Sequence, residues 1–283
     1  KKGHFTQIGF VTFFTILLMY RDRVLTSINI LPEFIETIGR SEALIKQFDN
    51  LQENYEKCKD KTYDPKNLNF HDLELENVCF EFKNKVIFKD IDLHLHTTDH
   101  KIIGLTGPSG RGKSTMCKMF LKMYKCNKGN VYIDGVNIED IDPVYVRTNI
   151  TYINQNSKLF DRNVLENLLY GCSDTDYCIE KMKFIMQYPK IKELYKDIDL
   201  EKNDCGPMGE KLSGGQRQVV NIISGLINPS RILILDEPTN ALDKQLKIEL
   251  LDIIKQFKKE KQAIIIITHD KDVYSMFDEH VTI

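Results

Sequence analysis

One glycine-rich stretch constrains the fold more than any other part of this 283-residue chain. It matches the pattern G-x-x-x-x-G-K-[ST], which arises by chance in about one chain in a hundred of this length. An apolar segment, residues 102–106, runs directly into it, and residues 116–124 after it have the character of a helix. A strand, a tight loop and a helix in this order predict a cradle for phosphate groups. The stretch consists of Gly107, Pro108, Ser109, Gly110, Arg111, Gly112, Lys113, Ser114 and Thr115.

The residue types in this stretch suit a nucleoside triphosphate. Glycines let backbone N–H groups converge on phosphate oxygens, and the start of the helix adds a partial positive charge. We expect Lys113 to reach the β and γ phosphates and the Ser114 hydroxyl to bind magnesium. A glycine-rich turn without a ligand is the alternative interpretation.

A pair of carboxylates follows a second apolar segment. Residues 232–235 form an apolar run that ends in Asp236 and Glu237. Asp236 is predicted to hold the magnesium shell, and Glu237 to orient and polarise the attacking water. Taken alone, such a pair would be a solvated loop. Its occurrence in a chain that also carries a phosphate cradle favours the catalytic interpretation.

The pattern of apolar residues predicts an α/β fold with two kinds of sheet. Residues 73–82 and 87–95 mostly alternate between apolar and polar positions, which is typical of an antiparallel pair with one buried face. Residues 156–228 lack strand-like runs, so we expect a mostly helical subdomain there. Ligands of parallel sheets bind beyond the carboxyl ends of the strands. Three short apolar runs favour such a sheet, covered on both faces, at residues 102–106, 232–235 and 263–267.

A second glycine-containing segment reads Leu-Ser-Gly-Gly-Gln at residues 212–216. It matches the signature of the ATP-binding cassette (ABC) family, and the resemblance extends from about Leu73 to the end of the chain. Physically, the serine and the two glycines open a helix whose N–H groups form a second anion site. A helix cap beside a flexible turn is the plainer interpretation.

The resemblance to the ABC family implies ATP and Mg²⁺ as ligands and a second cassette as partner. In that family two cassettes pack head to tail, so that each ATP lies between the cradle of one and the signature of the other. A single copy is therefore not expected to hydrolyse ATP efficiently. The residues expected to contact ATP in trans are Ser213, Gly214, Gly215 and Gln216.

The same resemblance assigns roles to three further positions. Phe82 would stack on adenine, where tyrosine is more usual; because it alternates with Phe80, a core position is the alternative. Gln155 would meet magnesium, although a solvated glutamine is the simpler interpretation. His269 would hydrogen-bond the γ-phosphate and help to fix the attacking water.

These assignments give three predicted sets besides the ATP contacts. The catalytic residues are Lys113, Glu237 and His269. The magnesium ligands are Ser114, Gln155 and Asp236. The loop that crosses the dimer interface is Asn240, Ala241, Leu242 and Asp243, with asparagine where serine is common.

Two positions depart from the pattern of the family's exporters. Gly206-Pro207 stands where they usually carry Gly-Glu, shortly before the signature, and Ser224 stands where arginine is common in the following helix. The first departure concerns communication with a membrane domain. Neither position supplies a phosphate or magnesium ligand, so ATP hydrolysis is expected to survive.

The segment before the first strands suggests a membrane connection. Residues 8–20 are almost uninterruptedly apolar but shorter than the roughly 20 residues of a bilayer-spanning helix. They form either a buried helix or strand, or part of a membrane helix. Residues 28–48 place apolar side chains at helical spacing, and residues 34–50 resemble the cytosolic extension of the last membrane helix in exporters. Residues 159–167 are similar to the segment that exporters present to their membrane domain.

We therefore expect the C-terminal part of an integral membrane exporter, with its cassette facing the cytosol. The chain begins without methionine and ends within an apolar run, which suggests a fragment. The transported substrate is not visible in the sequence. The expected parts are the end of the membrane domain at 1–48, a polar linker at 49–71, and the cassette at 72–283.

Two other classes of ABC protein compete with this interpretation. A soluble ATPase acting on DNA or ribosomes would carry a long coiled coil between cradle and signature, or a basic linker. Neither is present, and a formal net charge of −2 gives no basic excess for binding nucleic acid. A regulatory module that holds ATP without cleaving it is disfavoured because both Glu237 and His269 are present.

The cysteines predict a reducing compartment. They are odd in number and form no C-x-x-C pair, so we expect free thiols rather than disulfides or metal ligands. The seven are Cys58, Cys79, Cys117, Cys126, Cys172, Cys178 and Cys205.

Overall fold

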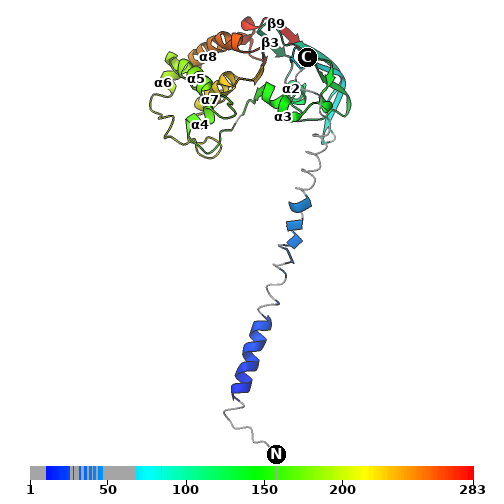
Figure 1. Cartoon of the computed structure of the whole chain (residues 1–283), viewed down its shortest axis with the longest axis vertical. Helices are drawn as coiled ribbons and strands as arrows, with labels where there is room; N and C mark the ends of the chain where they lie inside the picture. Colours follow the sequence, from blue (N-terminus) through cyan, green and yellow to red (C-terminus); the bar gives the residue numbers. More distant parts are fainter. Residues whose placement is uncertain are drawn as a thin grey trace, which may run out of the picture. The chain divides into compact units, whose positions relative to one another are not determined.

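The computed structural model describes residues 11–25, 28, 32, 35–36, 38–39, 41–42 and 44–46, and residues 68–283 except 84 and 157. The chain divides into two units, Lys1–Asp60 and Lys61–Ile283. In the first unit, residues 11–25 and the described positions after them are helical (Figure 1). Within the part of the chain that is described, no helix is both long enough and apolar enough to cross a membrane. The predicted membrane helix is therefore not shown, and residues 49–67 of the predicted linker lie outside the described residues.

The second unit contains a four-stranded antiparallel sheet with the strand order β2-β1-β4-β5. Strands β1 and β2 pair in a register that places Leu73 opposite Leu95 and Leu75 opposite Leu93. These four leucines are buried, and the residues between them point outward. The predicted antiparallel pair with one buried face is thus confirmed. The strands are β1 (Asp72–Phe82), β2 (Lys85–His96), β4 (Lys128–Ile133) and β5 (Val136–Asn137).

A five-stranded sheet, in the order β6-β7-β8-β3-β9, forms the centre of this unit, and all its strand pairs are parallel. Both of its faces are covered. Ile232 and Ile234 of β7 belong to one hydrophobic cluster, whereas Leu233 and Leu235 belong to the other. This is the predicted sheet with two buried faces. Its strands are β3 (Lys101–Thr106), β6 (Ile150–Ile153), β7 (Ile232–Asp236), β8 (Ala263–Ile267) and β9 (Glu279–Thr282).

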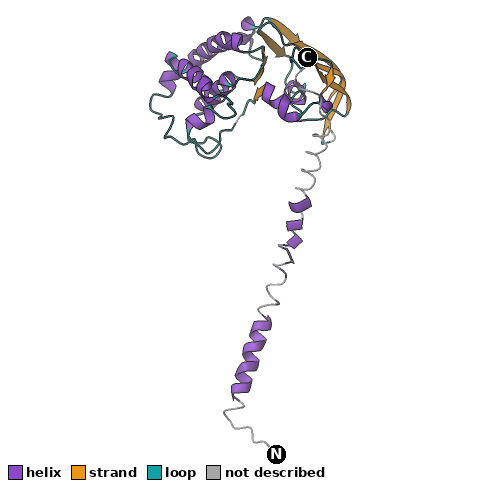
Figure 2. Ribbon diagram, in the orientation of Figure 1, coloured by secondary structure: helices purple, strands orange, loops and turns teal. Residues whose placement is uncertain are grey.

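Helices α4 to α7 gather at one end of this unit and the antiparallel strands at the other (Figure 2). Within 156–228 the only described β pairings are two isolated bridges, Leu159–Met208 and Asn163–Asp204, in agreement with the expected helical character. The helices are α2 (Lys113–Met119), α3 (Pro143–Asn149), α4 (Val164–Leu168), α5 (Thr175–Ile185), α6 (Pro189–Leu194), α7 (Gly214–Ile227) and α8 (Lys244–Phe257). Short 3-10 helices lie at Ile138–Asp140, Lys258–Glu260 and Lys271–Met276.

The prediction that all cysteines are free thiols is wrong at one place. Cys172 and Cys178 form a disulfide, and their Cα atoms lie 6.7 Å apart, within the range that this bond requires. Cys172 precedes α5 and Cys178 lies in it, so the turn into the helix brings the two together. A search for C-x-x-C pairs could not find this six-residue separation. Among the described residues, the free cysteines are Cys79, Cys117, Cys126 and Cys205.

The order of the parallel strands brings the candidate residues together. Strands β7, β8 and β3 are neighbours, and parallel strands have their carboxyl ends at the same edge. The glycine-rich loop follows β3, the two carboxylates stand at the end of β7, and His269 follows β8. Segments more than a hundred residues apart in the sequence thus meet at one edge.

Candidate functional site

A cavity of about 430 Å³ lies at this edge of the parallel sheet. Its wall combines the glycine-rich loop with the residues that follow β7 and β8. Ten of the residues predicted from the sequence line it, and three others that the sequence reasoning missed also do. The predicted ones are Ser109, Gly110, Gly112, Lys113, Ser114, Thr115, Gln155, Asp236, Glu237 and His269; the others are Lys85, Ile87 and Ile267.

Glycine is required at two positions of the loop. Gly107 and Gly112 have φ angles of 137° and 85°, a region that side-chain-bearing residues rarely adopt. A Cβ atom on Gly112 would lie 2.6 Å from Cδ1 of Phe88, and one on Gly107 would lie 2.3 Å from the Ile283 carbonyl oxygen. The loop is therefore packed closely against β2 and the segment after β9.

Lys113 reaches back across the loop that precedes it. It begins helix α2 and its exposed fraction is 8%. Its Nζ donates hydrogen bonds to the carbonyl oxygens of Gly107 at 2.9 Å and Pro108 at 3.0 Å. The loop thus holds a cation at its centre, where a phosphate group would meet it. A cradle of glycines around a buried lysine fits a polyphosphate ligand.

Asp236 lies buried at the end of β7, and Tyr152 holds it in place. The Tyr152 hydroxyl donates a hydrogen bond of 2.5 Å to Oδ2 of Asp236 and also contacts Ser114. Burial, together with the Asp236 carboxylate, raises the pKa of Tyr152 far above its usual value, so the tyrosine stays a proton donor. Sequence reasoning missed Tyr152. Its register opposite Ile234 of β7, two residues before Asp236, is the signal that could have found it.

The oxygen atoms around Asp236 fit a magnesium ion. Ser114, Asp236 and Gln155 all line the cavity. A hydroxyl, a carboxylate and an amide oxygen are hard ligands of the kind that Mg²⁺ prefers. The donor set that was predicted from the sequence is therefore brought to one place.

Glu237 is held by donors from the loop after β8. Its N–H donates to the Ile267 carbonyl at 2.8 Å, and its φ of 51° is unusual for a residue with a side chain. Its carboxylate accepts a hydrogen bond from Thr268 Oγ1 at 3.1 Å and lies 2.7 Å from Nδ1 of His269. Because a carboxylate accepts, Nδ1 is assigned the proton and Nε2 of His269 is left available for another partner. The predicted catalytic pair is thus in direct contact.

Asp270, the residue after His269, connects the loop after β8 to the loop after β7. Its carboxylate accepts a hydrogen bond from Thr239 at 3.1 Å and forms an ion pair with Lys247 of α8. Partial burial raises the pKa of Asp270, but hydrogen bonds from Lys247, the Asp272 N–H and Thr239 outweigh it and lower that pKa below its ordinary value. The predicted interface loop at 240–243 is therefore anchored to the loop that carries His269.

The signature segment caps helix α7. Ser213 accepts a hydrogen bond from the Gln216 N–H at 3.2 Å, and the Gln216 side chain accepts one from the Ser213 N–H at 2.8 Å. None of residues 213–216 lines the cavity around Lys113. Gly214 instead borders a separate hollow of about 360 Å³, together with Ala241. Within one chain, the cradle and the signature are therefore not brought together.

Several other predicted residues lie at the surface, whereas Leu242 is partly buried against the hydrophobic core. Phe82, at the end of β1, is 47% exposed, makes an edge contact with Tyr124, and does not line the cavity. Arg111 and Asn240 are exposed, and Asp243 caps helix α8. The adenine-stacking role of Phe82 stays a prediction.

Comparison with known proteins identifies this arrangement. Residues 88–240, more than half of the chain, match the ABC transporter family. The chain belongs to the ABC transporter family. This confirms the resemblance inferred from the glycine loop and the signature, and with it the fold class and the class of enzyme, an ABC-type ATPase.

Several relatives of this ABC chain illustrate the match. It is 30% identical over 224 residues to the lactococcin-G-processing and transport ATP-binding protein of Lactococcus lactis subsp. lactis, covering 77% of the chain and 31% of the relative. It is 29% identical to the ATP-dependent lipid A-core flippase of Albidiferax ferrireducens, covering 91% and 44%. A putative ABC transporter ATP-binding protein of Pyrococcus abyssi is 32% identical, with 71% and 72% covered.

A solved structure shows the same fold. The structure of a bacterial Atm1-family ABC exporter with ATP bound superimposes with a TM-score of 0.66 at 24% identity, over 76% of this chain and 38% of that chain. The chain thus spans less than half the length of the exporter of known structure, of the lactococcin-G-processing and transport protein, and of the flippase.

Proposed function

We propose that this ABC chain is the ATP-hydrolysing end of a membrane exporter, in which two cassettes close around ATP and separate after hydrolysis. The single observation that carries the proposal is the contact of Glu237 with His269 and Thr268 inside the Lys113 cavity. A carboxylate held by two donors, at the wall of a phosphate cradle, has the geometry of a base that orients water. The position of the signature outside that cavity supports a site completed by a second copy.

Each residue of the chain has a distinct task in this proposal. Backbone N–H groups of the glycine loop and Lys113 bind the phosphates, which fixes the γ-phosphate against Glu237. Glu237 accepts a proton from the attacking water, and Nε2 of His269 contacts the γ-phosphate. A magnesium ion held by Ser114, Asp236 and Gln155 would neutralise charge on the phosphates.

The second copy would supply the signature residues Ser213, Gly214, Gly215 and Gln216. They open helix α7, where the capping box engages the N–H groups of Ser213 and Gln216 and leaves those of Gly214 and Gly215 to suit an anion. Asn240 and Ala241 are exposed beside this segment, as an interface loop requires. Closure would expel water from the phosphates, which strengthens every electrostatic contact around them.

Two surfaces of the chain support the proposed association with a membrane domain. The described side chains of residues 11–25 are exposed, and large apolar ones such as Phe13, Phe14 and Leu17 are among them. Exposed apolar surface of this kind favours contact with a membrane or a membrane domain. The names of two relatives, which state transport and lipid A-core flipping, agree with a role at a membrane.

A hollow of about 340 Å³ is the proposed docking place of the membrane domain. It is lined by Phe160 and Tyr170, whose rings lie 4.4 Å apart between centroids, and by Ser224, which departs from the family's arginine. Buried Asn167 accepts a hydrogen bond from the Phe160 N–H and donates to the carbonyl oxygens of Phe160 and Asn163. This amide holds the segment 159–167 in the shape that a partner would meet.

The substitution Glu237→Gln tests the catalytic claim. Glutamine keeps the size and the hydrogen-bond acceptor but cannot take a proton from water, so binding of MgATP should persist. We expect turnover to fall by about 100-fold or more, and a dimer to accumulate with MgATP. Phosphate release and mass by light scattering measure the two effects. Near-normal phosphate release from this variant would refute the role of Glu237.

A further inference from the structure

Four ionisable side chains gather on the outer face of the antiparallel sheet, apart from the ATP cavity. In the β1–β2 register, Asp72 lies opposite His96 and Glu74 lies opposite His94. Residues two apart in a strand point to the same side. Because the leucines between them are buried, all four of these side chains face outward. Two histidines of one strand thus face two carboxylates of the next.

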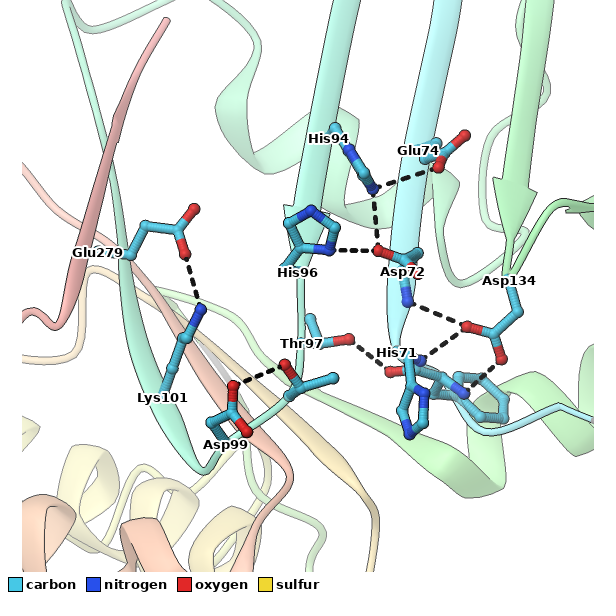
Figure 3. A network of polar contacts seen from close by, with 12 residues as sticks. His71, Asp72, Glu74, His94, His96, Thr97, Asp99, Lys101, Asp134 and Glu279 are labelled. Carbon is cyan, nitrogen blue, oxygen red and sulfur yellow. Dashed lines mark hydrogen bonds and ion pairs between the residues drawn. The ribbon is translucent and has the colours of Figure 1, made fainter.

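The four side chains are in contact with one another, as Figure 3 shows. Nε2 of His94 lies 2.9 Å from Oδ1 of Asp72 and 3.2 Å from Oε1 of Glu74. Nδ1 of His96 lies 2.5 Å from the same Asp72 oxygen. The two imidazole rings are 4.2 Å apart between centroids. One carboxylate oxygen is therefore approached by two ring nitrogens at once.

We propose that Asp72, His94 and His96 bind a divalent transition-metal ion, zinc above all, with Glu74 as a fourth ligand. The three ligand atoms lie within 4.8 Å of one another. Imidazole nitrogens and carboxylate oxygens are ligands of Zn²⁺, and two histidines disfavour Mg²⁺ and Ca²⁺, which take oxygen ligands.

The geometry requires only small movements to accept the ion. Ligands at 2.0–2.1 Å in a tetrahedron lie about 3.3 Å from one another. The contacts seen here, between 2.5 and 3.2 Å, are those of hydrogen bonds that the metal would replace. Side chains on an exposed sheet face can separate by the required distances, which reach about 0.8 Å for the shortest contact, between His96 and Asp72. The two ring nitrogens that now face a carboxylate would become metal ligands on neutral rings.

Charge also favours a divalent cation. With both imidazoles neutral, the two carboxylates carry two negative charges, which a Zn²⁺ ion balances. The two carboxylates therefore balance the charge of the ion without a further charged ligand.

Metal binding here would act on the edge of the sheet. Among the described strands, β2 is outermost in the order β2-β1-β4-β5 and pairs only with β1. An ion shared by Asp72 of β1 and the two histidines of β2 would join the edge strand to its neighbour. None of these four residues lines the ATP cavity, so we expect zinc binding to leave the affinity for MgATP unchanged.

Calorimetric titration of ZnCl₂ into the whole chain, treated with EDTA and free of nucleotide, tests the proposal. We expect one zinc ion per chain. His94→Ala and His96→Ala should each weaken binding by at least about 100-fold, since even residues behind a ligand change metal affinity 10- to 100-fold. Asp72→Asn should weaken it as well. The MgATP affinity of the same variants should be unchanged. This measurement also shows that the variants fold.

Two other histidines serve as matched controls. His71 is exposed and adjacent to Asp72 in sequence, but its ring points away from the cluster (Figure 3). His269 lies with Glu237 in the ATP cavity, where zinc could bind adventitiously. His71→Ala and His269→Ala should both keep the full zinc affinity. Absence of zinc binding, equal affinity in the parent and the His94→Ala/His96→Ala variant, or loss of binding in either control would overturn the proposal.

Discussion

Alanine at Gly112 should destabilise the chain far more than alanine at Gly110, although both glycines have the same backbone conformation. Their φ angles are 85° and 81°. An alanine in the left-handed region costs about 1–2 kcal/mol relative to glycine, and this applies to both positions. The surroundings differ: a Cβ on Gly112 would meet Phe88 at 2.6 Å, whereas a Cβ on Gly110 has nothing within 4 Å.

The clash determines the expected difference. Forcing a methyl group into a packed region typically costs about 1–3 kcal/mol. We therefore expect Gly110→Ala to lower the free energy of unfolding by about 1–2 kcal/mol and Gly112→Ala by about 2–5 kcal/mol. The contact atoms belong to Phe88 of β2, so the loss reports how the loop packs on the antiparallel sheet.

Urea unfolding without nucleotide is the suitable assay, because Gly110 faces the cavity and its methyl group would also meet a bound phosphate. The midpoints and slopes of both variants give the two free energies of unfolding. If the two variants lost the same free energy of unfolding, within about 0.5 kcal/mol, the inference that β2 packs closely against the loop would be wrong.

Two further predictions concern buried polar groups. Burial lowers the pKa of Lys261 from 10.5 to about 8, despite nearby Glu260, so the charged form destabilises the fold below pH 8 and this cost disappears as pH rises toward 10.5. At 1.36 kcal/mol per pKa unit, the parent should gain up to about 3 kcal/mol over Lys261→Met between pH 7 and 10.5 in urea unfolding; a constant difference would contradict this. Asn167→Ala should cost about 1–3 kcal/mol, because it leaves the N–H of Phe160 without its partner, whereas the Phe160 carbonyl oxygen keeps the hydrogen bond from the Arg162 N–H; unfolding midpoints measure it, and a loss below about 0.5 kcal/mol would count against the role of this amide.

Much of the site could be predicted from the sequence because its residues stand at strand ends. The loop 107–115, the pair Asp236 and Glu237, and His269 each follow a short apolar run, and the parallel topology brings such ends to one edge. Motif and topology together therefore predicted ten of the thirteen residues that line the cavity, and missed Lys85, Ile87 and Ile267.

Other parts depend on contacts that a linear pattern does not contain. Tyr152 contacts Asp236 through the pairing of β6 with β7, which is visible only once the strand order is known. The disulfide of Cys172 and Cys178 follows from the turn into α5. Likewise, the outward pair His94 and His96 looks like ordinary strand alternation until β1 is placed beside it.

The claim that a second copy completes the ATP site is tested most directly by Gly214→Asp in the Glu237→Gln background. Gly214 is exposed, has ordinary backbone angles, and a Cβ there would lie 4.0 Å from Ala241, so the variant should fold. An aspartate in the first turn also suits the helix dipole, but it places a negative charge where the partner's phosphate would bind. We expect calorimetry to show an unchanged MgATP affinity of the single chain, and light scattering to show loss of the MgATP-dependent dimer. Two results would contradict a site completed by a second copy. One is weaker MgATP binding by the single chain, and the other is a dimer as abundant as that of the Glu237→Gln variant alone.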